Sequence, residues 1–416
     1  MKSRMLIGFE QIQVSMKMDV LSPSHAKKLV LLSQDLPPKN KAQGSAISHT
    51  LSAIEQLGYI QIDTISVIQR AHHHTLWNRN PRYQLNHIDE LVENRDVFEY
   101  WSHAAAYLPM RDYRFSLYRK QAFKTGALSH WYKPNHELMK NVIQRIENEG
   151  PLMAKDFEGE RKHKGGWGGK PAKQALETLF MQGDLMVSSR SNFHKVYDLT
   201  QRVVPIGVDT SVPTEQEYAR YLVTQYLKAN GLGLAAEMSY LLKNTKPLVM
   251  KVLSEMLEEG SVIQVSVNGL AYFTLPRSLD LLNQPLARSK LKILSPFDNL
   301  LIQRKRMQAL FGYDYLIECY VPEAKRQYGY FCLPILWQGE LVGRMDCKVD
   351  RKTSVLNINN LVIEGDVEKW GASKQEGFVH ALRAELDGFM LFNHAKELVV
   401  HKTNLQGTYG EALVYK

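Results

Sequence analysis

The chain has 416 residues and a formal net charge of +9, with 23% charged and 44% hydrophobic residues. Because a domain holds about 150 residues, this length excludes a single compact core and predicts two to four domains. The ordinary composition excludes a disordered or collagen-like chain, and the basic balance favours polyanions, nucleic acid first, although charge alone identifies no specific partner.

The beginning of the chain and its cysteines indicate the cellular compartment. Residues 1–20 are interpreted as an N-terminal extension, because helical periodicity begins only after the turn and cap signal Ser22-Pro23-Ser24. No apolar run approaches the about 18 residues of a membrane span, and the extension lacks the sustained apolar core and small-residue cleavage site of a secretory signal. The three cysteines have no paired close spacing and predict neither disulfides nor a zinc or iron–sulfur site. We therefore expect a cytoplasmic protein without membrane contact.

A helix, a glycine and two short strands are predicted three times along the chain. Apolar spacing predicts the first helix over 46–57, ended by Gly58 and followed by a strand over 59–63. The second copy is AKQALETLFMQ, Gly183 and a hairpin in LMVSSRSNFHKVYDL, and the third is LVMKVLSEMLEE, Gly260 and strands around Asn268-Gly269. This outline is typical of a winged helix, whose helix before the hairpin can enter the major groove of DNA.

Strand-like runs replace this pattern from about residue 290. Their alternation, broken by turn signals such as Gln338-Gly339, predicts an antiparallel sheet or small barrel with one helix packed on it. The expected fold class is α+β, with tandem winged-helix modules and a C-terminal antiparallel β-barrel. The expected domains are the extension 1–20, winged-helix modules over 21–135, 136–212 and 213–285, and the barrel domain 286–416.

The strand over 59–63 carries the candidate catalytic residues. Alternation directs Ile60 and Ile62 toward a core and Tyr59, Gln61 and Asp63 to the other face. Residues two apart on a strand are about 6 to 7 Å apart, enough to hold a water or a sugar between an amide and a carboxylate. On the pattern alone, polar residues on a solvent-exposed strand face are the more common interpretation.

Two longer stretches carry a family resemblance. LGYIQIDTISVIQRAHHHTLWNR and VFEYWSHAAAYLPMRDYRF resemble the active-site region of the AlkZ and YcaQ family of crosslink-repair DNA glycosylases. Gln61-Ile62-Asp63 matches the glutamine–apolar–aspartate motif of the YcaQ branch, whereas the AlkZ branch has a second glutamine in place of Asp63. SPFDNLLIQRKR, YVPEAKRQYGYFCLPIL, GELVGRMDCK and FHKVYDLTQRVVP extend the similarity to near the C-terminus. The resemblance implies a concave DNA clamp with Gln61 and Asp63 as its catalytic pair.

The implied chemistry suits these two side chains. Breaking a glycosidic bond builds positive charge on the sugar, which a carboxylate such as Asp63 stabilises while it accepts a proton from the attacking water. The Gln61 amide can hold that water. A guanine alkylated at N7 is already cationic and leaves without a general acid. The resemblance therefore implies a monofunctional glycosylase, expected to be monomeric and free of cofactor and metal, acting on double-stranded DNA with alkylated or crosslinked bases.

Further residues are weaker candidates for the cleft or for DNA contact. His103 either lines the cleft or is a buried, hydrogen-bonded histidine. His72, His73 and His74 are consecutive, so a surface or phosphate-binding role is favoured over a metal site. Tyr328 and Tyr330 flank Gly329 and could stack on a base or sugar, although packing in the barrel core is the favoured interpretation. The basic candidates for phosphate contact, which are equally interpretable as solvated surface charges, are Lys170, Lys173, Arg190, Lys195, Arg202, Arg304, Lys325 and Arg326.

Two other classes of protein fit parts of the pattern. A winged-helix transcription regulator needs the same basic helices and hairpins but no catalytic pair, and it binds undamaged DNA in a sequence-specific way. A structural scaffold in a repair complex predicts DNA binding without turnover.

Overall fold

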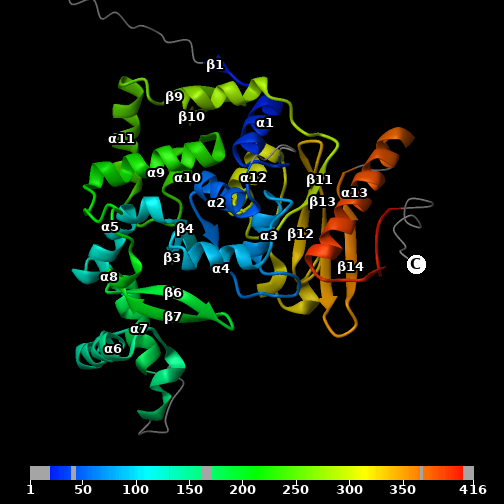
Figure 1. The fold of residues 1–416 in the computed structure, drawn as a ribbon. Coiled ribbons are helices and arrows are strands. Elements are labelled where there is room, and N and C mark those ends of the chain that lie inside the picture. The colour runs from blue at the N-terminus through cyan, green and yellow to red at the C-terminus, as the bar shows by residue number, and fades with distance from the viewer. Residues whose placement is uncertain (1–18, 39–43, 131, 161–170, 366–368, 406–416) are drawn as a thin grey trace, which may run out of the picture.

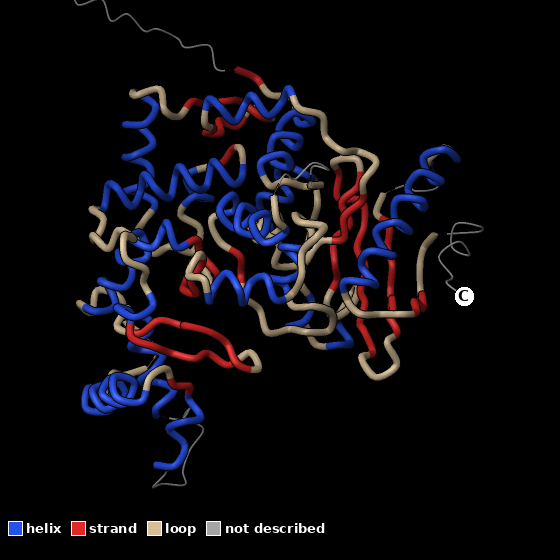
Figure 2. Tube along the Cα trace, in the orientation of Figure 1, coloured by secondary structure: helices blue, strands red, loops and turns tan. Residues whose placement is uncertain are grey.

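The computed structural model describes residues 19–38, 44–130, 132–160, 171–365 and 369–405. Within them the chain forms three successive units of helices with a small sheet, followed by a larger sheet (Figure 1). Helices dominate the first part and strands the last (Figure 2). No helix in these ranges is both long and apolar enough to cross a membrane.

Each of the three units has the same order of elements: a helix, a short strand, two helical segments and a hairpin. The first has α2 (Ala46–Leu57), β2 (Ile60–Gln61), α3 (Ala71–Trp77), α4 (Asn86–Glu93), β3 (Val97–Trp101) and β4 (Ala105–Pro109). The second has α6 (His136–Glu149), β5 (Leu152–Met153), the 3₁₀ segment η2 (Ala154–Glu160), α7 (Pro171–Gln182), β6 (Leu185–Ser191) and β7 (His194–Leu199). The third has α9 (Glu215–Asn230), β8 (Leu232–Gly233), α10 (Ala235–Met238), α11 (Lys246–Glu258), β9 (Ile263–Val267) and β10 (Leu270–Thr274).

The three sheets also share one strand order. The short strand of each unit pairs antiparallel with the second strand of its hairpin, which gives β2-β4-β3, β5-β7-β6 and β8-β10-β9. In the third sheet, β1 (Asp19–Val20) adds a parallel strand beside β9. The segments that connect the units are η1 (Met110–Asp112), α5 (Tyr113–Lys124), α8 (Thr200–Val203) and η3 (Pro276–Asn283). A common order of elements and strands makes the three units structural repeats.

The three predicted helices and the glycines that end them are confirmed. In the first unit, however, the predicted helix α2 is not the helix that directly precedes the hairpin. Gly58 ends α2 in the left-handed conformation, at φ 80°. However, α2 corresponds to α6 and α9, the first helices of the other units, and α3 and α4 intervene before its hairpin. The strand predicted over 59–63 is also shorter than expected, because only residues 60 and 61 pair with β4.

The C-terminal sheet is a half-barrel rather than the closed antiparallel barrel that the sequence predicted. Its strands run in the order β11 (Leu291–Ile293), β12 (Cys332–Trp337), β13 (Glu340–Asp350), β14 (Val355–Ile363) and β15 (Glu397–Val400). The crossover through α13 (Ala372–Phe392) brings β15 in parallel to β14. Among the described residues the edge strands β11 and β15 do not pair with each other, so the sheet stays open. Before β12 lie α12 (Arg304–Phe311), η4 (Glu318–Tyr320) and η5 (Glu323–Lys325).

The first unit shares its hydrophobic core with the C-terminal sheet. Ile54 and Ile60 belong to one buried cluster with Ile335 of β12 and with Leu382 and Phe389 of α13. The second unit packs in a cluster with β3 and α5, and the third has a cluster of its own. The strand that carries Gln61 is therefore supported from behind by residues far along the chain. The expected domain boundaries stay a prediction.

A buried ion pair joins the first unit to the segment after β11. The Arg79 guanidinium donates to both carboxylate oxygens of Asp298, at 2.7 and 2.8 Å, and the two side chains are 1% and 0% exposed. Arg79 also donates to the Gln34 backbone and side-chain oxygens, and to the Thr75 carbonyl. These bonds compensate for desolvation of both charges, because each remaining donor has a partner.

Replacing Asp298 by alanine is expected to destabilise the protein by about 3 to 5 kcal/mol, since Arg79 would stay buried without its counter-charge. The loss would be measured as a lower midpoint of urea unfolding. The matched control is Glu340→Ala, which removes the exposed 2.6 Å pair with Lys27 and should cost below about 1 kcal/mol. Equal losses in the two variants would contradict the importance of the buried pair.

Candidate active site

Gln61 is held by a histidine from the neighbouring hairpin. Ile60 and Ile62 are buried, as the alternation predicted, while Gln61 is half-buried. His103 lies in the turn between β3 and β4 and its Nε2 is 3.0 Å from Gln61 Oε1. Because an amide oxygen only accepts, the histidine carries its proton on Nε2 and donates it. His103 is half-buried and hydrogen-bonded, and its expected role in the cleft stays a prediction.

The electrostatic environment keeps His103 uncharged. Burial lowers the pKa of His103 to about 4, so the ring is neutral at physiological pH. Its ring also packs edge-on against Tyr59, with 5.3 Å between centroids, and lies 6.0 Å from the ring of Tyr240. The histidine thus fixes the orientation of the Gln61 amide without adding a positive charge beside it.

Asp63 stands just after β2, where a local turn fixes its carboxylate. Its Oδ1 accepts the backbone N–H of Ile65 at 2.7 Å, a bond typical of aspartate turns. Burial raises the pKa of Asp63 above its ordinary value, and the backbone N–H groups of Ile65 and Thr64 offset part of that rise. A half-buried carboxylate with a raised pKa is a stronger proton acceptor than an ordinary surface aspartate.

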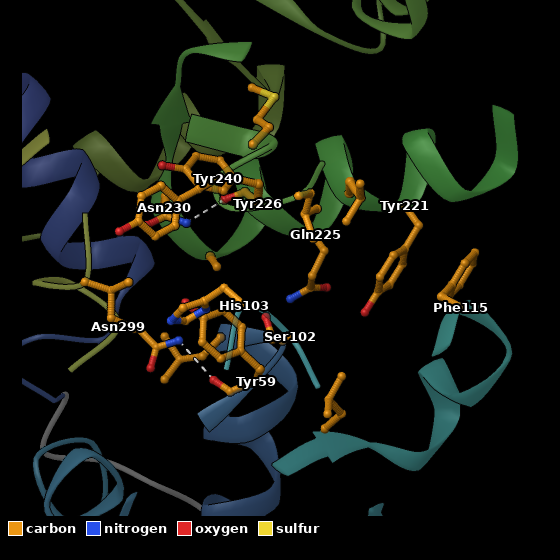
Figure 3. Close-up of a pocket in the computed structure, with 18 of the residues that line it drawn as sticks. Tyr59, Ser102, His103, Phe115, Tyr221, Gln225, Tyr226, Asn230, Tyr240 and Asn299 are labelled. Carbon is orange, nitrogen blue, oxygen red and sulfur yellow. Dashed lines mark hydrogen bonds between the residues drawn. The ribbon is translucent and has the colours of Figure 1, made fainter. Parts of the chain in front are cut away.

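Tyr59 is half-buried, and its ring contacts His103, the residue that is also hydrogen-bonded to Gln61. Its carbonyl accepts from Asn299 Nδ2 at 2.9 Å, and burial raises the pKa of its phenol. Figure 3 shows its ring beside His103 in a pocket between the first and third units. The role of Tyr59 in the cleft stays a prediction.

The pocket behind the strand has a volume of about 150 Å³ and largely aromatic walls. Trp101, Phe115, Tyr221 and Tyr240 line it together with Tyr59 and His103 (Figure 3). Gln61 and Asp63 are not among its lining residues. The pocket is therefore distinct from the position of Gln61 and Asp63, although His103 lines the pocket and is hydrogen-bonded to Gln61.

Two predicted DNA contacts are engaged inside the protein. Arg190 and Lys195 both bind the carboxylate of Glu99, which is 1% exposed, at 2.8 and 3.0 Å. Arg190 also donates to the carbonyl of Phe193. These bonds fasten hairpin β6–β7 to β3. Sequence reasoning missed Glu99, although a single acidic residue in the apolar strand VFEYW was an available signal.

The other basic candidates differ in their surroundings. Arg202 donates to the carbonyls of Ile146 and Glu147 at the end of α6. Arg304 donates to the carbonyls of Pro296 and Leu301. Lys173 on α7 and Lys325 in η5 are exposed, whereas Arg326 is half-buried, with its Nε 3.0 Å from the Val321 carbonyl. Lys170 lies outside the described residues, so its predicted role stays a prediction.

The surface role expected for the three consecutive histidines is wrong. His72 and His74 are 1% and 0% exposed, and His74 Nε2 donates to the carbonyl of Ile293 at 2.9 Å. His73 is hydrogen-bonded to the Tyr83 hydroxyl at 2.7 Å, and burial lowers the pKa of both His73 and His74 to about 4. Helix α3 packs against the segment after β11, so all three neutral rings belong to the interior.

The comparisons with known proteins identify the class. The model of the family described as "DNA glycosylase AlkZ-like" matches residues 54–392 of the chain. The protein belongs to this family and is an enzyme, a DNA glycosylase, which excludes the regulator and the scaffold as its class. A solved structure, DNA glycosylase AlkZ of Streptomyces sahachiroi, matches with a TM-score of 0.64 at 15% identity, covering 92% of this chain and 100% of that chain. This likeness shows a shared fold.

Replacing His103 by phenylalanine should slow base release about fivefold, because it removes the hydrogen bond that orients Gln61 but keeps an aromatic ring against Tyr59. The measurement is the single-turnover rate on lesion-containing duplex, with the melting temperature recorded for each variant. His103→Gln, which restores an amide donor, should recover part of the rate. An unchanged rate in the phenylalanine variant would show that the bond to Gln61 does not matter for turnover.

Proposed function

We propose that the protein is a monofunctional glycosylase that hydrolyses the bond between deoxyribose and N7-alkylguanine or related cationic bases in duplex DNA, including crosslinked bases, leaving an abasic site. The observation that carries this proposal is the half-buried Asp63 carboxylate, fixed two residues from an amide that a neutral histidine orients. The agreement of Gln61-Ile62-Asp63 with the motif of the YcaQ branch supports the same assignment.

The reaction needs only these two side chains. As the bond from sugar C1′ to the base breaks, the base takes the bonding electrons and its positive charge is neutralised, while positive charge develops on the sugar. The Asp63 carboxylate stabilises that charge and accepts a proton from the water whose oxygen bonds to C1′. Gln61 Oε1 already accepts from His103, so its Nε2–H₂ group is the donor that can hold the water or a sugar oxygen.

The repeated units are proposed to be winged-helix modules, over 21–135, 136–212 and 213–285, that form a concave clamp on DNA. Their common strand order and the net charge of +9 support this assignment. Lys173 is exposed on α7, the helix before the second hairpin, and is the best-placed candidate there for a phosphate contact. Because a clamp built from three repeats needs no second copy, the proposed active form is a monomer.

Purified protein is expected to release 7-methylguanine from duplex DNA, and Asp63→Asn to reduce the rate roughly 100-fold or more, as for loss of a general base. Gln61→Ala should reduce the rate by a smaller factor, since water can still reach the sugar without a hydrogen bond from the amide. A second substrate with an interstrand crosslink, followed on a denaturing gel, tests unhooking. Absence of base release by the wild type, or an undiminished rate in the asparagine variant, would refute the proposed function.

The pH dependence provides a separate test. Since the deprotonated carboxylate is the active form, the rate should fall as pH drops through the raised pKa of Asp63, placing the acidic limb above 3.8. A raised pKa in the folded state also means that the charged form lowers stability at pH values above it. Asp63→Asn should therefore melt no lower than the wild type at neutral pH, and calorimetry showing a clearly lower melting temperature would contradict this.

A further inference from the structure

The segment 316–330, called here the Glu318 loop, is fixed by a buried carboxylate. Glu318 is 6% exposed, and its two oxygens accept the backbone N–H groups of Gln327, Tyr328 and Gly329 at 2.8, 2.8 and 3.0 Å. These bonds lower the pKa of Glu318 despite the opposing effect of desolvation. One charged side chain thus joins the start of the loop to its end, so the loop is preorganised.

The same loop is seated on the C-terminal sheet. Asn360 of β14 donates to the Tyr328 carbonyl at 2.9 Å, and Asp346 of β13 accepts the backbone N–H of Phe331 at 2.8 Å. Gly329, at φ 153°, lies so close to Asp346 that a Cβ atom would come within 2.2 Å of its carboxyl carbon. The base of the loop is therefore packed tightly against the sheet.

The loop nevertheless exposes large apolar side chains. Leu316, Tyr320 and Tyr330 are 62%, 77% and 38% exposed. A flexible segment could reduce this exposure by collapsing onto the surface, but the bonds of Glu318 prevent such a rearrangement. Exposed apolar groups held out by a rigid support are typical of a binding surface.

The Glu318 loop packs beside the strand that leads to Asp63, because Ile317 contacts the hydrophobic cluster that contains Ile60 and Ile62. Desolvation raises the pKa of the Tyr320 phenol, and the nearby Cys319, Asp63 and Tyr330 contribute to the rise. The guanidinium of Arg326 lies 5.0 Å from the centre of the Tyr330 ring, and Lys325 is exposed. Exposed aromatic rings with cations beside them are suited to nucleic acid, whose bases stack and whose phosphates attract positive charge.

We propose that Tyr320 stacks on a base of the duplex next to the lesion and thereby holds the target sugar against Asp63. This inference rests on the proposed function, because it assigns a substrate-positioning residue to that site. A base is favoured over a protein partner because the exposed ring adjoins the carboxylate that acts on a nucleotide's sugar. The positive charge of Lys325 suits the accompanying phosphates, and insertion of an apolar side chain at a base step is a known means of unstacking DNA.

The test compares Tyr320→Ala with Tyr320→Phe, since the phenylalanine variant keeps the ring and loses only the hydroxyl. With duplex that carries an abasic-site analogue beside 2-aminopurine, the wild type and Tyr320→Phe should lower the 2-aminopurine fluorescence, because a ring stacked on this base quenches it, and Tyr320→Ala should not. The alanine variant should also bind this duplex about tenfold more weakly, and release 7-methylguanine at least that much more slowly. Leu391→Ala, which removes another exposed apolar side chain, on α13, is the matched control and should behave as the wild type.

The outcomes separate this inference from the proposed function. If the wild type releases base and Tyr320→Ala matches it in rate, affinity and fluorescence, the stacking role is refuted and the glycosylase assignment stands. If the wild type releases no base, the proposed function fails, and the fluorescence and affinity of the two Tyr320 variants still decide whether the ring contacts DNA. If Tyr320→Phe loses as much affinity and rate as Tyr320→Ala, stacking of the ring is refuted, and the hydroxyl group is the part of Tyr320 that matters.

Discussion

The buried pairing of Arg79 with Asp298 is the constraint on which the site depends. Removing two ions from water costs several kcal/mol each, and here the cost is offset by bidentate geometry and by oxygen partners from Gln34 and Thr75. The pair fixes the segment after β11 against α3, and the next residue, Asn299, donates to the carbonyl of Tyr59. A contact between residues 219 apart in sequence therefore helps to position the start of the strand that carries Gln61.

Desolvation acts in opposite directions on the two titratable groups of the site. It raises the pKa of Asp63, which strengthens that carboxylate as a base, and lowers the pKa of His103, which removes a charge. In the proposed reaction, a protonated histidine beside Gln61 would repel the cationic base and the sugar that is becoming positive. A neutral ring supplies the hydrogen bond without that repulsion. Partial burial therefore gives Asp63 and His103 the protonation behaviour that each role requires.

Local signals account for what the sequence predicted correctly. The helices over 46–57, 171–182 and 246–258 follow from apolar spacing and terminal glycines, and Ile60 and Ile62 are buried as alternation requires. The open sheet could not be predicted, because a crossover through α13 makes β15 parallel to β14. Nor could Arg190 be recognised as a partner of Glu99, 91 residues away. The catalytic assignment of Gln61 and Asp63 came from family resemblance, since alternation alone indicates an ordinary solvent-exposed face.

Strand β1 and helix α1 (Pro23–Ser33), at the start of the described residues, pack mainly against segments from the second half of the chain. Strand β1 lies against β9, and α1 contacts η3, α9 and α12, burying Leu29 and Leu31 in a cluster with Leu300 and Met307. During synthesis these residues leave the ribosome more than 200 residues before η3 and α12, which cover their apolar surface. The nascent chain thus carries an exposed apolar helix for most of its translation, a period in which chaperone binding has its greatest value.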